Sequence, residues 1–335
     1  MRALVLKKHG SPETAFAVEE RPEPAVGDGQ VRVKVHAAGL NFADIVARVG
    51  LYPDAPKPPA VMGYEVAGEV ESARGDGFQP GQRVIAATRF NGFAELATAN
   101  VKDVLPLPEG MSYEEGAALP VVYGTAYAAI VLMAAVRPGE TVLVQSAAGG
   151  VGIAAVQILC DRGAQAIGSA SASKHDAVRE QGCSHLIDYR TQDVKAEVDR
   201  ITGGKGVDVV LDALGEFRRS YSMLAPGGRL VMYGASNVVT GDRRNMVKAL
   251  REIATLPRFN PLKLMNANKA VMGLNLLHWW DDRGSLEELT RPLLDLVDRG
   301  VVKPVVAASF PFERAAEAHR FVQDRKNVGK VVLTP

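Results

Sequence analysis

Hydrophobic and polar residues alternate in short stretches along the first third of the chain. The alternation is clearest over residues 2–6 and over residues 30–35, which have the sequence QVRVKV. Two further strands are expected at 66–71 and 82–87, with glycine- and proline-rich turns between them. Alternation with a period of two residues is typical of half-buried strands. The pattern therefore predicts a β-rich, barrel-like first domain.

From Thr141 onward, short apolar runs alternate with helical segments. We expect six strands, near 141–145, 165–169, 186–189, 208–213, 229–234 and 270–275. Strands that are covered on both faces have nearly continuous apolar runs, and strands that alternate with helices form parallel sheets. This part of the chain therefore predicts an α/β fold, with a doubly wound, six-stranded parallel sheet.

The remaining segments connect these two patterns. Residues 114–133 are expected to form a pair of helices interrupted at Pro120, because proline cannot continue a helix. The tail is expected to contain two helices and two strands, near 285–299, 313–323, 302–308 and 330–333. We expect the tail to rejoin the β-rich domain. The first domain then comprises 1–121 and 276–335, and the second comprises 122–275.

The first expected strand of the sheet leads into a glycine-rich turn. Val142–Val144 are apolar, and Ala147–Gly152 have the sequence AAGGVG, which fits G-x-G-x-x-G with alanine in the first glycine position. Gly149 would let the backbone approach a pyrophosphate, and Gly152 would let the following helix pack closely on the strand. An ordinary strand-to-helix turn is the alternative, but the alternating strands and helices that follow favour a nucleotide site.

Composition narrows the classes of function. The 335 residues include 39 Lys and Arg against 38 Asp and Glu, a formal net charge of +1, which argues against a nucleic-acid binder. The two cysteines, Cys160 and Cys183, are too few for a disulfide framework or a four-cysteine zinc site, and we expect both to be buried. Without a recognisable signal peptide or apolar span, a cytoplasmic protein is expected.

The end of the second strand of the sheet indicates which dinucleotide is bound. NAD-specific folds place an acidic residue there, about 20 residues after the last glycine, where it binds the ribose 2′-hydroxyl. Here Gly168–Lys174 have the sequence GSASASK, without a carboxylate. Hydroxyls and a lysine suit a 2′-phosphate, so NADPH is favoured over NADH. In the alternative interpretation, Ser173 is a helix N-cap and Lys174 is a solvated side chain.

Five segments carry a family resemblance: AGLNFAD (38–44), GLYP (50–53), GYEVAG (63–68), AAGGVG (147–152) and NVGKV (327–331). They resemble the medium-chain dehydrogenase/reductase superfamily, in its zinc-free quinone oxidoreductase branch. The likeness covers essentially the whole chain, and within that branch it is greatest to the synaptic-vesicle VAT-1-like group. The resemblance implies a GroES-like catalytic domain interrupted by a Rossmann domain, NADPH as cofactor and a homodimer.

Two positions bear on whether the protein binds zinc. In the zinc-containing relatives, a cysteine stands at the place of Asn41 and a histidine at the place of Tyr64. Asparagine and tyrosine are poor zinc ligands, so no catalytic zinc is expected. The six histidines are scattered, and His278, beside two tryptophans, is expected to be a packing or surface residue.

The resemblance also implies cofactor contacts at matching positions. Asn41 matches an asparagine that binds near the nicotinamide ribose, and Thr125 matches a threonine near the nicotinamide. Ser171, Lys174 and Tyr189 match the 2′-phosphate pocket, although Tyr189 is alternatively a half-buried strand residue. Other expected contacts come from the phosphate turn and from two strand ends: Ala148, Gly149, Gly150, Val151 and Gly152, then Gly234, Ala235, Ser236, Gly273, Leu274 and Asn275.

Without a metal, such an enzyme acts mainly by holding the reduced nicotinamide against an electron-poor acceptor. Water can protonate the hydroquinone anion that hydride transfer to a quinone produces, whereas reduction of an enone or enoyl thioester ends with protonation at carbon. Tyr52 is the candidate acid, because enoyl-thioester reductases of the superfamily resemble this chain in having a tyrosine there. An aromatic wall of the pocket is the alternative role.

We therefore expect an NADPH-dependent quinone or enone reductase in which Tyr52 and Asn41 are the candidate catalytic residues. One alternative is an enoyl-thioester or alkenal double-bond reductase. The other is an NADPH-binding protein, associated with a membrane or partner, that has little turnover.

Residues 241–270 form a basic segment between two expected strands. The segment contains seven basic and two acidic residues, a net charge of +5. Its apolar and basic side chains fall on different faces of a helix expected before Pro257: Met246, Leu250 and Ile253 on one, and Arg244, Lys248 and Arg251 on the other. The segment is either a helix packed on the sheet, or a cap over the acceptor pocket that also binds anionic membranes weakly.

Overall fold

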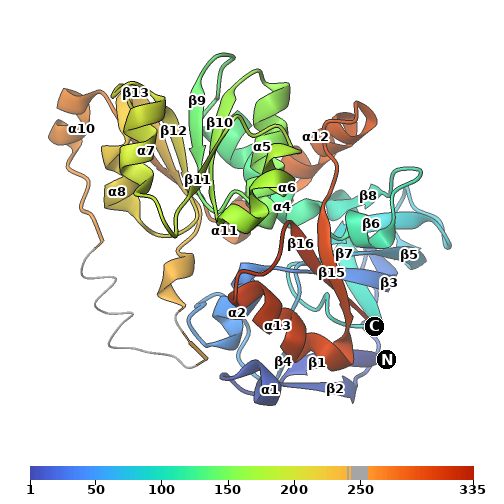
Figure 1. The fold of residues 1–335 in the computed structure, drawn as a ribbon. Helices are drawn as coiled ribbons and strands as arrows, with labels where there is room; N and C mark the ends of the chain where they lie inside the picture. Colours follow the sequence, from blue (N-terminus) through green and yellow to red (C-terminus); the bar gives the residue numbers. More distant parts are fainter. Residues whose placement is uncertain (240, 243–255) are drawn as a thin grey trace. The chain divides into compact units, whose positions relative to one another are not determined.

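The computed structural model describes residues 1–239, 241–242 and 256–335, and these form two compact units. The β-rich unit contains residues 1–124, 241–242 and 277–335. The Rossmann unit contains residues 125–239 and 256–276. Figure 1 shows the fold, with labels on many of the helices and strands of both units. The helix expected over the basic residues 243–255 lies outside the described part of the chain.

The β-rich unit contains two sheets. The larger has seven strands in the order β15-β16-β3-β5-β6-β8, with β7 also paired to β3, and the smaller has the order β2-β1-β4. All pairs are antiparallel except β15 with β16. The strands are β1 (Arg2–Leu6), β2 (Phe16–Glu20), β3 (Gln30–Leu40), β4 (Ala60–Val61), β5 (Glu65–Arg74), β6 (Arg83–Ala87), β7 (Leu96–Asn100), β8 (Val104–Pro106), β15 (Val306–Pro311) and β16 (Lys330–Thr334).

The tail joins this unit as expected, because β16 pairs with β3, with Val331 opposite Leu40. One expected boundary is wrong. The strand predicted from residue 302 begins only at Val306, since Pro304 has no N–H to donate to a strand ladder.

Short helices connect the strands of the β-rich unit. Helix α4 begins at Pro120, where proline is well tolerated at the first helical position, and α3 ends at Gly116, so the expected interruption is confirmed. The helical elements are α1 (Pro12–Ala15), α2 (Phe42–Arg48), η1 (Val101–Asp103), α3 (Tyr113–Gly116), α4 (Pro120–Tyr127), α11 (Leu276–Arg283), α12 (Glu287–Asp298), η5 (Phe312–Arg314) and α13 (Ala315–Gln323).

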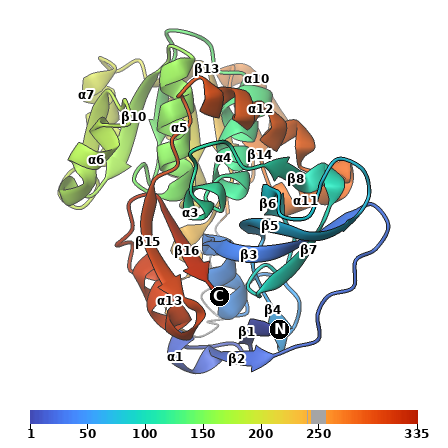
Figure 2. The same cartoon turned by 90° about the vertical axis from the view of Figure 1, so that its right-hand side faces the viewer.

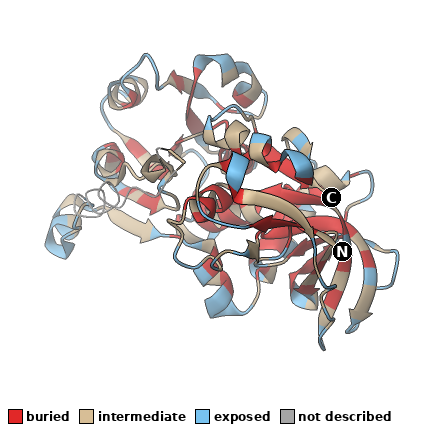
Figure 3. Ribbon diagram, turned by 90° about the horizontal axis from the view of Figure 1, so that it is seen from below, coloured by how far each residue is buried: buried red, intermediate tan, exposed pale blue. Residues whose placement is uncertain are grey.

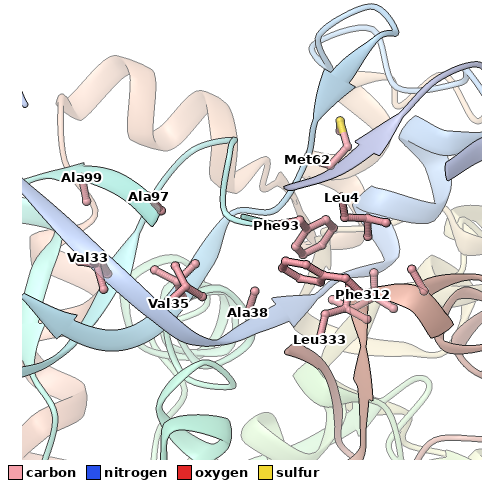
Figure 4. Close-up of a cluster of buried hydrophobic side chains, with 14 of the residues drawn as sticks. Leu4, Val33, Val35, Ala38, Met62, Phe93, Ala97, Ala99, Phe312 and Leu333 are labelled. Carbon is pink, nitrogen blue, oxygen red and sulfur yellow. The ribbon is translucent and has the colours of Figure 1, made fainter. Parts of the chain in front are cut away.

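The core of the β-rich unit lies where strands distant in sequence meet. Phe93 and Phe312 are buried together with Leu4 and Leu333 (Figure 4). A Cβ added to Gly63, which has φ of +95°, would lie 2.6 Å from the Phe93 ring, so only glycine permits this approach. Buried residues are frequent in β3, β5 and β16, whereas β2 and β15 contain none. Figure 3 colours the buried and exposed residues along the ribbon.

A buried histidine lies in the same unit. His319 of α13 is 1% exposed, its ring centroid is 4.6 Å from that of Phe16, and neither ring nitrogen has a hydrogen-bond partner among the described residues. Burial, together with the positive charge of Arg48, holds the pKa of His319 well below its usual value of 6.5.

The variant His319→Leu is expected to be less sensitive to acid than the native protein. Below pH 6.5 the unfolded native chain binds a proton that the folded chain does not, so the free energy of unfolding falls as pH falls. The difference should approach about 1.4 kcal/mol for each pH unit below that value. Urea unfolding of both proteins between pH 7.5 and pH 5 measures it, and parallel stability curves would contradict the assignment.

The Rossmann unit is built on the expected parallel sheet, whose strand order is β11-β10-β9-β12-β13-β14. Helix α5 packs on β10 (Figure 2). The strands are β9 (Thr141–Val144), β10 (Gln165–Ala170), β11 (His185–Asp188), β12 (Val207–Asp212), β13 (Leu224–Met232) and β14 (Ala270–Gly273). All six predicted strands are present, which confirms the predicted fold class.

The helical elements of the Rossmann unit include the π-helical segment η2 (Ala128–Met133), α5 (Gly150–Asp161), η3 (Ala172–Lys174), α6 (His175–Arg179), α7 (Val194–Ile201), α8 (Phe217–Ser222), η4 (Ser236–Val238) and α10 (Pro261–Ala267). Cys183 is buried as expected, but the prediction for Cys160 is wrong. Residues 152–159 of α5 are buried, and Cys160 near its end is exposed. No helix in the described ranges has both the length and the apolar character needed to cross a membrane.

Candidate active site

The glycine-rich turn joins β9 to α5. Ser146 adopts the left-handed conformation, with φ of +53°, and Gly149 is the N-cap of α5. A Cβ on Gly152 would lie 2.3 Å from the carbonyl oxygen of Ser146, so the close packing predicted for this glycine is present. The first N–H groups of a helix have no intrahelical partners, and the first turn of α5 contains no acidic residue. The turn, with Ala148, Gly150 and Val151, is therefore suited to a pyrophosphate.

The candidate 2′-phosphate residues follow two neighbouring strands. Ala170 of β10 is paired in register with Asp188 of β11, so Ser171 and Tyr189 leave the sheet at adjacent positions. Ser171 is buried, and its hydroxyl lies 3.5 Å from that of Ser173. These hydroxyls lie at the carboxyl edge of the sheet, where doubly wound folds bind their ligands.

Two alternative interpretations of these residues are wrong. Ser173 is not a helix N-cap, because Ser171 is the N-cap of η3 and Lys174 is the N-cap of α6. Tyr189 is not within a strand, since β11 ends at Asp188, and its side chain is exposed.

The carboxylate of Asp188 forms hydrogen bonds with residues that follow it closely in sequence. It accepts hydrogen bonds from the Arg190 N–H and from the Thr191 hydroxyl, and these bonds with their neighbours hold its pKa below the usual value. Both donors belong to the turn that follows β11, so the Asp188 carboxylate stabilises this turn.

Two other strand ends carry the remaining candidates. A Cβ on Gly234 would lie 2.8 Å from the carbonyl oxygen of Ala213, so the turns after β12 and β13 approach closely. The Leu274 N–H donates to the carbonyl of Met232, which places the end of β14 beside the end of β13. Of the other candidates, Ala235 and Ser236 follow β13, Asn275 follows Leu274, and Thr125 is buried in α4.

Sequence reasoning missed one residue of this edge. Asp212, the last residue of β12, is buried and accepts hydrogen bonds from the N–H groups of Leu214 and Gly215 and from the Ser220 hydroxyl. Burial is the main reason that its pKa is raised. Asp212 thereby fixes the turn between β12 and α8.

In the β-rich unit, three polar side chains meet inside the larger sheet. Asn41 follows β3, Glu65 is the first residue of β5, and Lys330 is the first residue of β16, and the three strands are neighbours. The Lys330 ammonium donates to Asn41 Oδ1 at 2.6 Å and to Glu65 Oε1 at 2.5 Å. Asn41 Nδ2 donates to Glu65 Oε1 at 2.9 Å. Sequence analysis singled out Asn41 but neither charged partner.

Asp44 lies beside this cluster at the start of α2. Its Oδ2 accepts the backbone N–H of Asn41 at 2.8 Å, whereas its Oδ1 is buried with no hydrogen-bond partner in the described part of the chain. Removal from water raises the pKa of Asp44 to about 7, against the opposing effects of the Asn41 N–H and the Lys330 charge. Sequence analysis did not single out Asp44, because its burial becomes visible only in the structure.

Tyr52 and Tyr64 lie near these groups. Burial raises the pKa of Tyr52 to about 12, and the charges of Asp54 and Asp44 add to the effect. The Tyr52 hydroxyl therefore stays protonated at neutral pH. Tyr64 is more deeply buried, which raises its pKa further, and its ring centroid is 5.0 Å from that of Phe90.

Asn41 and Tyr64, which stand where zinc-containing relatives have zinc ligands, make other contacts in the structure. Asn41 is bound to Glu65 and Lys330, and Tyr64 packs against Phe90. Across the described ranges, no group of three or more His, Cys, Asp or Glu side chains is arranged to hold a metal ion. His278 is exposed and lies 3.0 Å from Asp54.

A parallel sheet with a turn suited to a phosphate, in a chain that also folds a β-rich unit, is an arrangement found in two-domain, dinucleotide-dependent oxidoreductases. Residues 27–109 match the alcohol dehydrogenase GroES-like domain, and residues 181–333 match the zinc-binding dehydrogenase domain. The chain belongs to the medium-chain dehydrogenase/reductase family.

Individual proteins show which members of this family the chain resembles. It is 40% identical to the human synaptic vesicle membrane protein VAT-1 homolog over 344 residues, which cover 100% of this chain and 86% of the relative. The Escherichia coli quinone oxidoreductase, solved in complex with NADPH, has a TM-score of 0.86 at 28% identity and full coverage of both chains. The CurK enoyl reductase has a TM-score of 0.85 at 28% identity, with 99% of this chain and 98% of that chain covered.

Proposed function

We propose that the protein uses NADPH to reduce a quinone or an activated enone, without a metal. The observation that carries this proposal is the Asn41–Glu65–Lys330 cluster, which engages the Asn41 amide where zinc-containing relatives have a cysteine. The similarity to an NADPH-bound quinone oxidoreductase supports the same conclusion. When bound, NADPH supplies the hydride.

The residues have separate roles in this proposal. The turn from Ala148 to Gly152 binds the pyrophosphate through backbone N–H groups. The 2′-phosphate is bound by Ser171, Lys174 and Tyr189, and the nicotinamide end is oriented by Asn41 and Thr125. The strand ends at 234–236 and 273–275 complete the cofactor site. Orientation and exclusion of water then supply much of the rate.

Turnover measurements test this function. We expect the purified protein to oxidise NADPH in the presence of an ortho-quinone or an enone, to contain no stoichiometric zinc, and to retain its activity in EDTA. If the protein contains one zinc per chain, and EDTA removes this zinc together with the activity, the metal-free mechanism is contradicted. Tight NADPH binding without turnover of any activated acceptor would instead favour a binding protein with little catalysis.

Replacing Lys174 with Ala should weaken NADPH binding by about 1–3 kcal/mol, the scale of a hydrogen bond to a charged group, and leave NADH binding nearly unchanged. Lys205→Ala is the matched control, since this exposed lysine precedes β12 and lies at the opposite edge of the sheet. Titration of both cofactors by tryptophan fluorescence or calorimetry measures the effect. Equal losses for NADPH and NADH would remove Lys174 from the 2′-phosphate site.

An enoyl-thioester or alkenal double-bond reductase is the second candidate. The specific observation in its favour is the Tyr52 hydroxyl, whose pKa of about 12 leaves it protonated and able to donate at neutral pH. The similarity to the CurK enoyl reductase supports this candidate.

We further propose a homodimer, in keeping with the family. Leu262 and Met265 of α10 are exposed in the single chain, which supports an interface between copies, and sedimentation analysis tests it. We also propose that the protein binds anionic membranes weakly and is located in the cytoplasm. Liposome co-sedimentation tests the membrane binding.

A further inference from the structure

We infer that Gln145, Ser220 and Asp212 are positioning residues whose hydrogen bonds hold the start of the glycine-rich turn in the shape that binds a phosphate group. The inference rests on the NADPH-dependent function proposed above, in which this turn binds the pyrophosphate. All three residues are buried, and all three belong to the Rossmann unit, as the turn does. The chain of hydrogen bonds therefore acts within one folded unit.

The hydrogen bonds of this chain run in one direction. Gln145 Nε2 donates to Ser220 Oγ at 3.0 Å, and Ser220 Oγ donates to Asp212 Oδ2 at 2.6 Å. Asp212 Oδ1 accepts the backbone N–H groups of Leu214 and Gly215 at 2.8 and 2.9 Å, so both carboxylate oxygens act as acceptors. The Ser220 hydrogen must then point at Asp212, which leaves the Ser220 oxygen to accept from the nitrogen end of the Gln145 amide. Asp212 thereby fixes which way this amide faces.

Gln145 lies between β9 and the turn. Its backbone N–H donates to the carbonyl of Leu211 at 3.2 Å, which extends the pairing of β9 with β12 by one residue. The next residue, Ser146, has φ of +53°, a conformation that non-glycine residues keep only where their surroundings impose it. The Ser146 carbonyl accepts the Gly149 N–H at 2.8 Å and faces Gly152, so its position sets the shape of the turn. The Gln145 side chain fixes the backbone immediately before this carbonyl.

Stability alone does not explain the Gln145 amide. Its Oε1 is buried and has no hydrogen-bond partner in the part of the chain that the structure describes. A buried acceptor without a partner costs free energy that an apolar side chain of similar size, such as methionine, would avoid. The bond from Nε2 to Ser220 therefore serves the geometry of the turn. A turn that already has its binding shape loses less conformational freedom when a phosphate binds, so the affinity for that phosphate depends on the chain.

The variant Ser220→Ala breaks the chain in the middle and removes one oxygen atom. It should bind 2′,5′-ADP about threefold to tenfold more weakly than the native protein, up to the scale of one lost hydrogen bond. Adenosine 2′-monophosphate, which lacks the 5′-phosphate that meets the turn, should bind equally well to both. Calorimetry measures the two affinities, and urea unfolding shows that the variant is folded. Equal weakening of both ligands, or no weakening of either, would overturn the inference.

The variant Gln145→Met asks whether the chain acts through the residue before the turn. It should weaken 2′,5′-ADP binding by a similar factor in the native background and much less in the Ser220→Ala background, because both changes break the same chain. Full additivity would overturn the inference. This variant also tests the chain if Ser220→Ala does not fold.

Thr202→Val is the matched control. The Thr202 hydroxyl also donates one hydrogen bond, to the Val198 carbonyl, and accepts another, from the Gly206 N–H, but it follows α7 at the opposite edge of the sheet. This variant should bind both ligands as the native protein does. If the native protein binds neither NADPH nor 2′,5′-ADP, the proposed function fails, and the inference fails with it. If the native protein binds both ligands and the chain variants match it, only the inference fails.

Discussion

Replacing Tyr52 with Phe is expected to lower the rate of enal or enoyl-thioester reduction by about 100-fold or more, the usual scale of general acid catalysis, and to change quinone reduction little. The reason is that only protonation at carbon uses the hydroxyl, whereas both reactions use the ring as a wall of the pocket. The raised pKa, about 12, keeps that hydroxyl protonated throughout the assay range. Steady-state rates with crotonyl thioester, an enal and an ortho-quinone measure the effect.

Tyr113→Phe is a suitable control for this experiment. The Tyr113 hydroxyl donates to Glu69 at 2.9 Å, so the control also removes one tyrosine hydroxyl and its hydrogen bond from the β-rich unit. It should leave all three rates close to native. A uniform small effect of Tyr52→Phe on every acceptor would identify Tyr52 as a wall of the pocket and remove it as the acid.

Lys330→Met alone is expected to lower the free energy of unfolding by about 3–5 kcal/mol, because it leaves the Glu65 carboxylate buried without its cationic partner. Adding Glu65→Gln should restore most of that loss, since the remaining groups are neutral and Gln can still accept the Val121 N–H. Urea unfolding of the native protein, the single variant and the double variant measures both steps.

Two results would contradict this prediction. If the single variant is as stable as the native protein, Glu65 is solvated or neutral, and the buried pair does not exist as described. If the double variant is as unstable as the single variant, lost packing of the lysine stem accounts for the effect.

The fold was predictable because its signals are local. Six apolar runs separated by helical segments define the parallel sheet, and each run is one of the strands from β9 to β14. The position of Gly152 was also predictable, since a strand, a glycine-rich turn and a helix are consecutive in sequence. The strands β2, β4, β7 and β8 were not predicted. They contain two to five residues each, which is too short for alternation to stand out from chance.

Parts of the candidate site were predictable for the same reason. Ser171, Lys174 and the glycine-rich turn follow recognisable strands, so their positions at the carboxyl edge could be inferred from order alone. Exposure was harder to infer than position. The exposure of Cys160 and Tyr189 depends on where a helix or a strand ends relative to the packed core. Such ends are the least certain feature of a sequence pattern.

The sequence by itself determined the two architectures, the phosphate turn and the absence of a carboxylate after the second strand of the sheet, because each depends on residues close together in the chain. Only the tertiary structure brought Lys330 to Asn41, 289 residues away, and to Glu65, 265 residues away. Both charges lie in segments that carry the family resemblance, GYEVAG and NVGKV, but nothing in either segment indicates that the two side chains meet. Their pairing arises because β16 returns to β3 and β5, and sheet pairing over such separations leaves no periodic signal in any single segment.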